Sequence, residues 1–175
     1  MLGVSVMAIN VPKEYEVPLY LFHQGKNAEA YKLFGSHFAE KDGVSGVVFR
    51  VWAPKAADVS VVGDFNHWNR EESYMKKISD GGIWELFIPG LKKFDNYKYS
   101  IKTERGQIKL KADPYGYHME TRPNTASKVY DISGYNWKDS KWMDEKKTKD
   151  VYRSPMNIYE VHLNSWFTKT DEEEL

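Results

Sequence analysis

One stretch of the sequence places aromatic and polar side chains directly after an apolar segment. Val61–Gly63 is typical of the end of a strand, and Asp64–Trp68 follows as a turn that directs two aromatic and two polar side chains outward. Aromatic faces beside polar groups suit a ligand made of flat rings with apolar faces and polar edges. The chain is 15% aromatic, with 6 Trp and 12 Tyr, which fits such a ligand or a β-core.

Several other kinds of chemistry are excluded by composition. The chain has no cysteine, so thiol catalysis, disulfides and thiolate metal sites are ruled out. No two histidines have a metal-ligand spacing with a third donor nearby, so we expect no metal and no cofactor. The histidines are His23, His37, His67, His118 and His162.

Charge and hydropathy narrow the possible partners. The formal net charge is zero, which gives no electrostatic basis for binding nucleic acid or an anionic membrane. No segment approaches the roughly 20 apolar residues of a membrane span. The first residues lack the basic start and the cleavage site of a signal peptide. We therefore expect a cytoplasmic protein without nucleic-acid or membrane partners.

A β-domain must position the turn at Asp64–Trp68. In Asn96–Thr103 strong alternation puts Tyr97 and Tyr99 on one face and Lys98 on the other. The predicted strands cover residues 44–52, 58–62, 83–88, 96–103, 107–111 and 126–132. Short strands separated by turn signals predict an all-β, immunoglobulin-like antiparallel β-sandwich over about residues 40–133.

The segment before the sandwich has a helical pattern. Residues 1–39 are predicted to be extended as far as residue 18 and then to form two short helical turns. Gly25 and Gly35 are predicted to end these turns, because glycine adopts the left-handed backbone that often follows a helix.

The segments after the sandwich are predicted to lead into another domain. Residues 134–154 are a charged connector whose tryptophans, Trp137 and Trp142, we expect to pack against a neighbour. Residues 155–175 begin with one apolar strand, at 155–163, and contain no partner strand for it. An isolated strand after a completed sandwich indicates the start of a truncated domain.

Four stretches resemble the bacterial glycogen branching enzymes, the 1,4-α-glucan branching enzymes of the α-amylase superfamily. The sandwich stretches alone are shared with isoamylase-type debranching enzymes and with the glycogen-binding domain of a kinase regulatory subunit. The first and last stretches favour branching enzymes. The first is Phe22–Gly25 with Ala30–His37, and the second is Phe49–Pro54 with Val59–Trp68. The third is Gly82–Gly90 with Tyr97–Tyr99, Lys111–Tyr115 and Arg122–Pro123. The fourth is Ile158–Leu163.

This resemblance implies a fold and an activity. The sandwich is similar to carbohydrate-binding module family 48, and the final strand resembles the first strand of a (β/α)8 barrel. The parent enzyme would cut an α-1,4-glucan and rejoin it through an α-1,6 link, using two carboxylates in a retaining mechanism. Barrel active sites draw on strand ends spread over about 250 residues. We therefore expect this chain to lack the catalytic residues and to be inactive alone.

The resemblance also implies a carbohydrate-binding site. Trp68 matches the tryptophan platform of glycogen-binding relatives, and Lys98 matches their hydroxyl-contacting lysine. Asn66 adds a hydrogen bond to the sugar or shapes the turn. Ile108 stands where those relatives carry a second platform tryptophan. Since half of the platform is missing, two roles stay open for Trp68, namely contact with a glucan and packing against the barrel.

Two classes of function follow. In the first, the chain is the amino-terminal part of a branching enzyme in glycogen biosynthesis, and its sandwich docks on an intramolecular barrel and orients glycogen or a maltooligosaccharide. In the second, it is a free-standing glycogen- or starch-binding module, or the amino-terminal domain of a debranching enzyme. The isolated strand favours the first, because an exposed apolar strand promotes aggregation.

Overall fold

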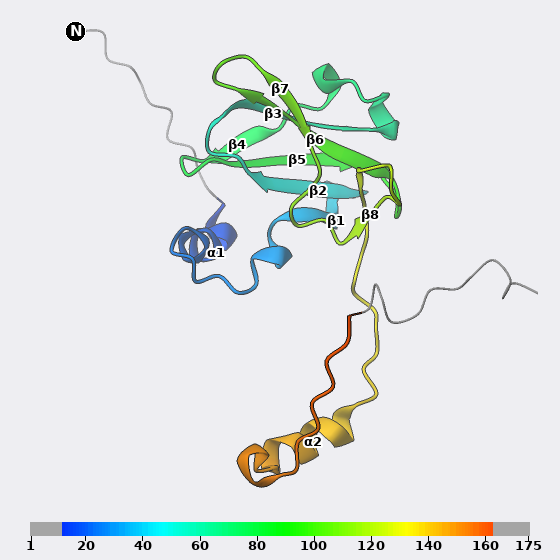
Figure 1. Cartoon of the computed structure of the whole chain (residues 1–175). Coiled ribbons are helices and arrows are strands. Elements are labelled where there is room, and N and C mark those ends of the chain that lie inside the picture. The colour runs from blue at the N-terminus through cyan, green and yellow to red at the C-terminus, as the bar shows by residue number, and fades with distance from the viewer. Residues whose placement is uncertain (1–11, 163–175) are drawn as a thin grey trace, which may run out of the picture. The chain divides into compact units, whose positions relative to one another are not determined.

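The computed structural model describes residues 12–162, which fall into two units divided between Ser133 and Gly134. The first unit is an antiparallel β-sandwich, which confirms the predicted fold class (Figure 1). Sheet A has the strand order β1 (Gly35–Lys41), β2 (Val44–Trp52), β5 (Ile83–Pro89) and β4 (Lys76–Ser79). Sheet B has the order β3 (Ala56–Gly63), β6 (Asn96–Thr103), β9 (Ser127–Lys128) and β8 (His118–Met119), and β7 (Ile108–Lys111) also pairs with β6.

The core lies between the two sheets and follows the alternation of the strands. Phe49 of β2 and Tyr97 of β6 are fully buried, and their ring centres lie 4.9 Å apart. Tyr99 is also fully buried, as the alternation in β6 predicted. Burying a large apolar side chain stabilises a fold by about 1.5–3 kcal/mol. The inner faces of both sheets are thus fixed, and only their outer faces can carry a binding site.

The outer face of sheet A is covered by α1 (Lys13–His23) and by the short helix η1 (Ala30–Lys32). Leu19 of α1 packs with Phe34 and with Ile83 of β5 in a second buried cluster. The prediction that the chain is extended as far as residue 18 is therefore wrong from Lys13 onward, while residues 1–11 lie outside the described part. Pro18 lacks a backbone N–H and so removes one hydrogen bond from α1, but burial of the apolar side of the helix stabilises it by more than this loss costs.

Three edge strands were not predicted, namely β1, β4 and the two-residue β8. β1 and β4 carry many charged and polar residues, so neither shows the apolar alternation of a buried strand. Such composition is common at sheet edges, where it discourages pairing with other chains. Gly35, predicted to end a helical turn, begins β1. The final predicted strand, 126–132, is reduced to the two residues of β9. The domain boundaries proposed from the sequence stay a prediction.

The second unit contains α2 (Ser140–Thr148) and the short helix η4 (Val151–Arg153). α2 was predicted only as a connector. Trp137 is 75% exposed within the described residues, with its ring centre 4.8 Å from that of Tyr135, and its packing against a neighbouring domain stays a prediction. Trp142 lies beneath the Lys146 ammonium, which is 4.9 Å from its ring centre.

The apolar strand predicted at 155–163 is not formed in residues 155–162, and Leu163 lies outside the described part. Ile158 is 85% exposed. A strand exists as part of a hydrogen-bonded ladder, and within residues 12–162 no strand pairs with this segment. In the same range, no helix is long and apolar enough to cross a membrane.

Candidate functional site

The turn that follows β3 is built around the side chain of Asn66. Its Oδ1 accepts a hydrogen bond from the Gly63 amide at 2.9 Å. Its Nδ2 donates to the Val61 carbonyl and to Ser73 Oγ, each at 3.0 Å. Asn66 is 4% exposed, so its amide is committed to the protein. Of the two roles that the sequence left open for Asn66, the geometry supports shaping the turn.

Gly63 lets this turn approach the neighbouring strand. A Cβ atom at this position would lie 2.1 Å from the carbonyl oxygen of Asn96. Any other residue would therefore push the turn away from β6. The consequence is that side chains of the turn reach the polar groups at the start of β6.

Trp68 stands at the beginning of a row of hydrogen-bonded side chains. It is 39% exposed, and its Nε1 donates to Asp64 Oδ1 at 2.9 Å. Asp64 Oδ2 accepts from Asn96 Nδ2 at 2.9 Å, and Asn96 Oδ1 accepts from Lys128 Nζ at 2.8 Å. We call Asp64, Asn96 and Lys128 the polar row, and Trp68 lies at its start. The row crosses the outer face of sheet B from the turn after β3 to β9.

Lys98 lies on the same outer face. It follows Asn96 by two residues along β6, so both side chains point away from the core that holds Tyr97. Its Nζ donates to Thr125 Oγ1 at 2.7 Å. An ammonium group has three donors, so Lys98 retains donors for a ligand hydroxyl. The structure thus places Trp68 and Lys98 on one face, with the polar row beside them.

Ile108, at the position that the resemblance assigns to a second platform tryptophan, also lies on this face. It is opposite Lys102 in the pairing of β7 with β6, and paired residues share a face. Its side chain is 55% exposed. The β7 side of the face is therefore aliphatic, and Trp68 is the aromatic group beside the polar row at the β3 end.

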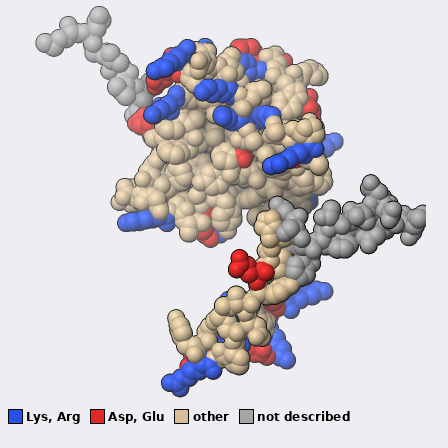
Figure 2. Space-filling model, viewed as in Figure 1, with Lys and Arg blue, Asp and Glu red and all other residues tan. Residues whose placement is uncertain are grey.

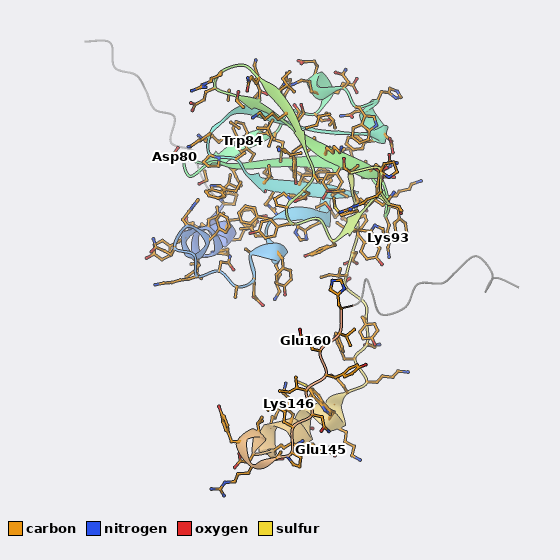
Figure 3. All side chains as sticks on the ribbon, viewed as in Figure 1. Asp80, Trp84, Lys93, Glu145, Lys146 and Glu160 are labelled. Atoms are coloured by element: carbon orange, nitrogen blue, oxygen red, sulfur yellow. The ribbon has the colours of Figure 1, made fainter. Side chains whose placement is uncertain are left out.

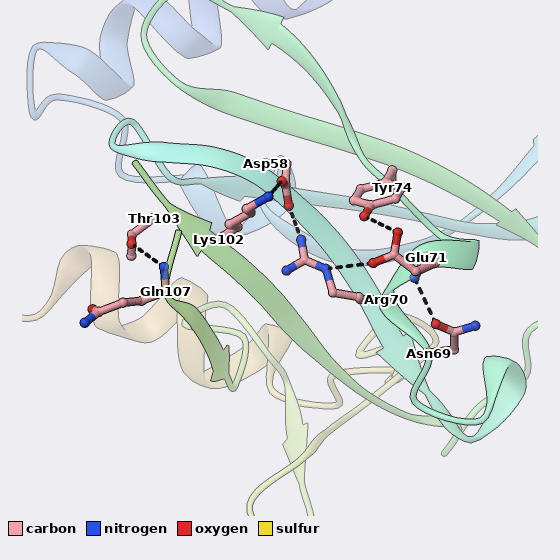
Figure 4. Close-up of polar contacts among 8 residues, drawn as sticks. All are labelled: Asp58, Asn69, Arg70, Glu71, Tyr74, Lys102, Thr103 and Gln107. Atoms are coloured by element: carbon pink, nitrogen blue, oxygen red, sulfur yellow. Dashed lines mark hydrogen bonds and ion pairs between the residues drawn. The ribbon is translucent and has the colours of Figure 1, made fainter. Parts of the chain in front are cut away.

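Charge pairs occupy the other end of β3 (Figure 4). Arg70 of the short helix η3 (Arg70–Glu72) donates to Asp58, whose Oδ2 lies 3.8 Å from Lys102 Nζ. Tyr74 donates to Glu71 at 2.6 Å in the same network. These groups neutralise one another, so this end of the outer face offers little free charge to a ligand.

A buried carboxyl group supports the strand beneath the site. Asp113 Oδ2 accepts from the hydroxyls of Tyr97 at 2.6 Å and Tyr99 at 3.1 Å, and Asp113 Oδ1 accepts from the Tyr115 amide. Burial raises the pKa of Asp113, while these hydrogen bonds act in the opposite direction. Its position behind β6 makes it a structural group that holds the strand bearing Lys98.

The surface of the first unit carries charges of both signs. Figure 2 shows Lys and Arg gathered on its upper part, where Figure 1 places β3, β6 and β7, with Asp and Glu around them. The zero net charge of the chain agrees with this mixture. Sites for neutral ligands combine an apolar surface with a few placed polar groups, as Trp68 and the polar row do.

Similarity to known proteins agrees with this geometry. Residues 33–116 match the family described as carbohydrate-binding module 48, the isoamylase N-terminal domain. Over 165 residues the chain is 51% identical to the 1,4-alpha-glucan branching enzyme GlgB of Bacillus subtilis strain 168. The chain is homologous to the amino-terminal region of GlgB branching enzymes. The alignment spans 94% of this chain and 26% of that enzyme.

A second GlgB enzyme is similar to this chain over nearly the same length. The branching enzyme GlgB of Bacillus cytotoxicus is 51% identical over 156 residues, which is 89% of this chain and 24% of the relative. The chain thus spans about a quarter of the length of the GlgB enzymes it matches. A maltotriose complex of the pullulanase PulA from Klebsiella pneumoniae has a TM-score of 0.48 at 27% identity, covering 61% of this chain and 12% of that one. Similarity at that level supports no conclusion about function.

Several residues of the site were missed in the sequence. Asp64 was considered only as part of the turn, yet it holds both Trp68 and Asn96. Asn96 could have been found, because it has the same alternation as Lys98. Lys128 and Thr125 could not, since β9 is only two residues long and Thr125 lies in the loop before it, so neither carries a periodic signal.

Proposed function

We propose that this chain supplies the glucan-associated amino-terminal part of a 1,4-α-glucan branching enzyme. The observation that supports this most is 51% identity to GlgB over 94% of the chain, far beyond the sandwich itself. That breadth favours branching over a free-standing module or a debranching enzyme. Transfer of an α-1,4-glucan segment to a 6-hydroxyl would be carried out by a catalytic barrel in the same protein. A cytoplasmic location belongs to the same proposal.

The sandwich would contribute to this reaction by holding glucan on the outer face of sheet B. Trp68 offers an apolar ring face, and Lys98 offers donors to sugar hydroxyls. One aromatic contact contributes about 0.5–1.5 kcal/mol, and each neutral hydrogen bond a similar amount. A site of this size binds weakly, so its value lies in raising the local concentration of glucan near a tethered active site.

Glucan binding can be tested by replacing Trp68 with glycine, which the backbone conformation at this position allows. Trp68 has φ = 60°, which glycine adopts without strain, so Trp68→Gly removes the ring and preserves the turn. We expect affinity electrophoresis in glycogen to retard the wild-type chain and to leave Trp68→Gly almost unretarded. Phe38→Ala, at an exposed aromatic of β1 in sheet A, is the matched control and should migrate like the wild type. Equal retardation of wild type and Trp68→Gly would contradict the site.

The proposal that this chain is part of a branching enzyme can be tested by exchanging it for the matching region of a known branching enzyme. The chain would replace the homologous region of the Bacillus subtilis enzyme, and branching would be followed by the loss of iodine staining of amylose. We expect the exchanged enzyme to branch amylose, because the interface with the barrel should be preserved at 51% identity. A folded exchanged enzyme with no activity would contradict the proposal.

A further inference from the structure

A second aromatic group lies at the far end of the polar row. The ring centre of Phe94 is 5.4 Å from that of His118 and 5.5 Å from that of Tyr130, and the last two are 5.1 Å apart. We call Phe94, His118 and Tyr130 the aromatic cluster. Lys93 Nζ lies 4.0 Å from the centre of the Tyr130 ring, and Figure 3 shows Lys93 at the β8 end of the sandwich.

This cluster continues the polar row on the same face. Lys128 of β9 is opposite Asn96 on one side and opposite His118 of β8 on the other. Residues directly opposite one another in antiparallel strands share a face. Tyr130 follows Lys128 by two residues and contacts His118. The outer face of sheet B therefore carries Trp68 at one end, a hydrogen-bonded polar strip in the middle and the aromatic cluster at the other end.

Both ends present an exposed ring from strained backbone. Phe94 is 50% exposed with φ = 76°, and Trp68 is 39% exposed with φ = 60°. Left-handed backbone is unfavourable for a bulky residue and tends to occur at functional sites. The Phe94 amide donates to the carbonyl of Val129, the residue that follows β9, at 2.7 Å, and this hydrogen bond holds the conformation. No packing requirement of the core explains it, since half of the Phe94 side chain faces solvent.

We propose that the aromatic cluster is a second subsite for the same linear α-1,4-glucan, reached by a chain that runs along the polar row from Trp68. The ligand is neutral, because the strip holds one carboxylate, Asp64, and one ammonium, Lys128, whose opposite charges leave it without net charge, and both groups are hydrogen-bonded to uncharged side chains. Lys93 Nζ lies 4.0 Å from the centre of the Tyr130 ring and 5.4 Å from that of Phe94, and Phe94, which is half exposed, supplies the accessible ring surface. This inference rests on the proposed glucan binding at Trp68.

Two subsites on one face predict a dependence on chain length. A short oligosaccharide fills only the Trp68 end, whereas a longer one also reaches Phe94 and gains a second, intramolecular contact. The affinity for the longer ligand should therefore fall when the Phe94 ring is removed, while the affinity for the short ligand should stay unchanged.

The experiment uses the whole chain with maltotriose and maltoheptaose, titrated by calorimetry. Phe94→Gly removes the ring at a position where glycine relieves the backbone strain, and urea unfolding checks that the variant remains folded. We expect Phe94→Gly to weaken maltoheptaose about threefold to tenfold, the range given by one aromatic contact, with maltotriose unaffected. Phe38→Ala should change neither affinity.

Each other outcome has a separate meaning. If Trp68→Gly weakens both oligosaccharides and Phe94→Gly weakens neither, the second subsite is wrong and the proposed function stands. If Phe94→Gly weakens both ligands equally, the two ends do not act as ordered subsites and the inference is also wrong. If the wild type binds neither oligosaccharide, or binds them independently of Trp68, the proposed glucan site itself fails.

Discussion

Arg50 and Tyr15 join α1 to sheet A, with the central guanidinium carbon of Arg50 lying 4.3 Å from the centre of the Tyr15 ring. Arg50 also donates to the Tyr15 hydroxyl and, from Nε, to Glu85 Oε2 at 2.6 Å. A single side chain on the outer face of β2 thus holds the helical segment and the neighbouring strand β5. The arginine is 8% exposed, so its partners replace most of its hydration.

Arg50→Leu should destabilise the chain by about 2–3 kcal/mol, because Glu85 loses its ion pair and α1 loses its anchor. Tyr15→Phe keeps the ring over the guanidinium and loses only the hydroxyl, so it should cost about 0.5–1.5 kcal/mol. Urea unfolding followed by circular dichroism measures both. A smaller effect for Arg50→Leu than for Tyr15→Phe would contradict this order.

Asp113 should make stability depend on pH in an unusual direction. Its folded-state pKa lies above the ordinary value of 3.8, so the folded protein holds this proton more tightly than the unfolded chain does. Its contribution to the free energy of unfolding is therefore complete below pH 3.8 and is lost as the pH rises through the folded-state pKa.

Asp113→Asn isolates this effect, because the amide cannot ionise. The free energy of unfolding of the wild type minus that of the variant should decrease as the pH is raised from about 4 to about 7. Urea titrations of both proteins across this range measure the difference, in which the other titrating groups cancel. A difference that increases with pH would show that the folded-state pKa of Asp113 is lowered rather than raised.

Replacing two glycines, Gly82 and Gly106, compares the cost of backbone strain alone with the cost of strain and steric clash together. Gly82 has φ = 85° and a Cβ there would lie 2.2 Å from Pro54 Cα, whereas Gly106 has φ = 79° and nothing within 4 Å. Gly106→Ala should cost about 1–2 kcal/mol, the cost of the left-handed backbone. Gly82→Ala should cost clearly more, since the chain at Pro54 must also move. Thermal unfolding of the pair tests this, and equal losses would contradict it.

Asp64 is a positioning residue whose loss should affect binding more than stability. Asp64→Ala removes the acceptor for Trp68 Nε1 and for Asn96 Nδ2 on an exposed surface. We expect glycogen affinity to fall about threefold to tenfold while unfolding changes by less than about 1 kcal/mol. Trp68→Phe is the companion variant, since it keeps an aromatic face without the hydrogen bond. If Asp64→Ala binds like the wild type while Trp68→Phe does not, the hydrogen bond has no positioning role.

The interior of the sandwich could be predicted because burial on one face imposes a period of two. The bounds predicted for β2 and β6 agree with the structure, and the left-handed Gly25 follows α1 as its position indicated. Edge strands such as β1 and β4 could not be predicted in this way, because their side chains do not alternate between buried and exposed positions. Lys98 could be assigned to its face from alternation alone.

The rest of the site depended on long-range contacts. Asn66 was chosen for its polar side chain, and nothing local reveals that its amide is used by Gly63, Val61 and Ser73. Phe94 precedes β6 in a turn, where no period applies, so its place beside His118 and Tyr130 follows only from the pairing of β8 and β9.

The segment that matches the carbohydrate-binding module, residues 33–116, excludes both α1 and β9. Excising it would uncover Phe34 and Ile83, leave Arg50 without Tyr15, and remove Val129 from the centre of the core. The residues that match the module are therefore fewer than the residues that must fold together. A shortened protein for binding studies should keep residues 12–133, because a chain cut at 33 and 116 would be expected to aggregate rather than to report on glucan.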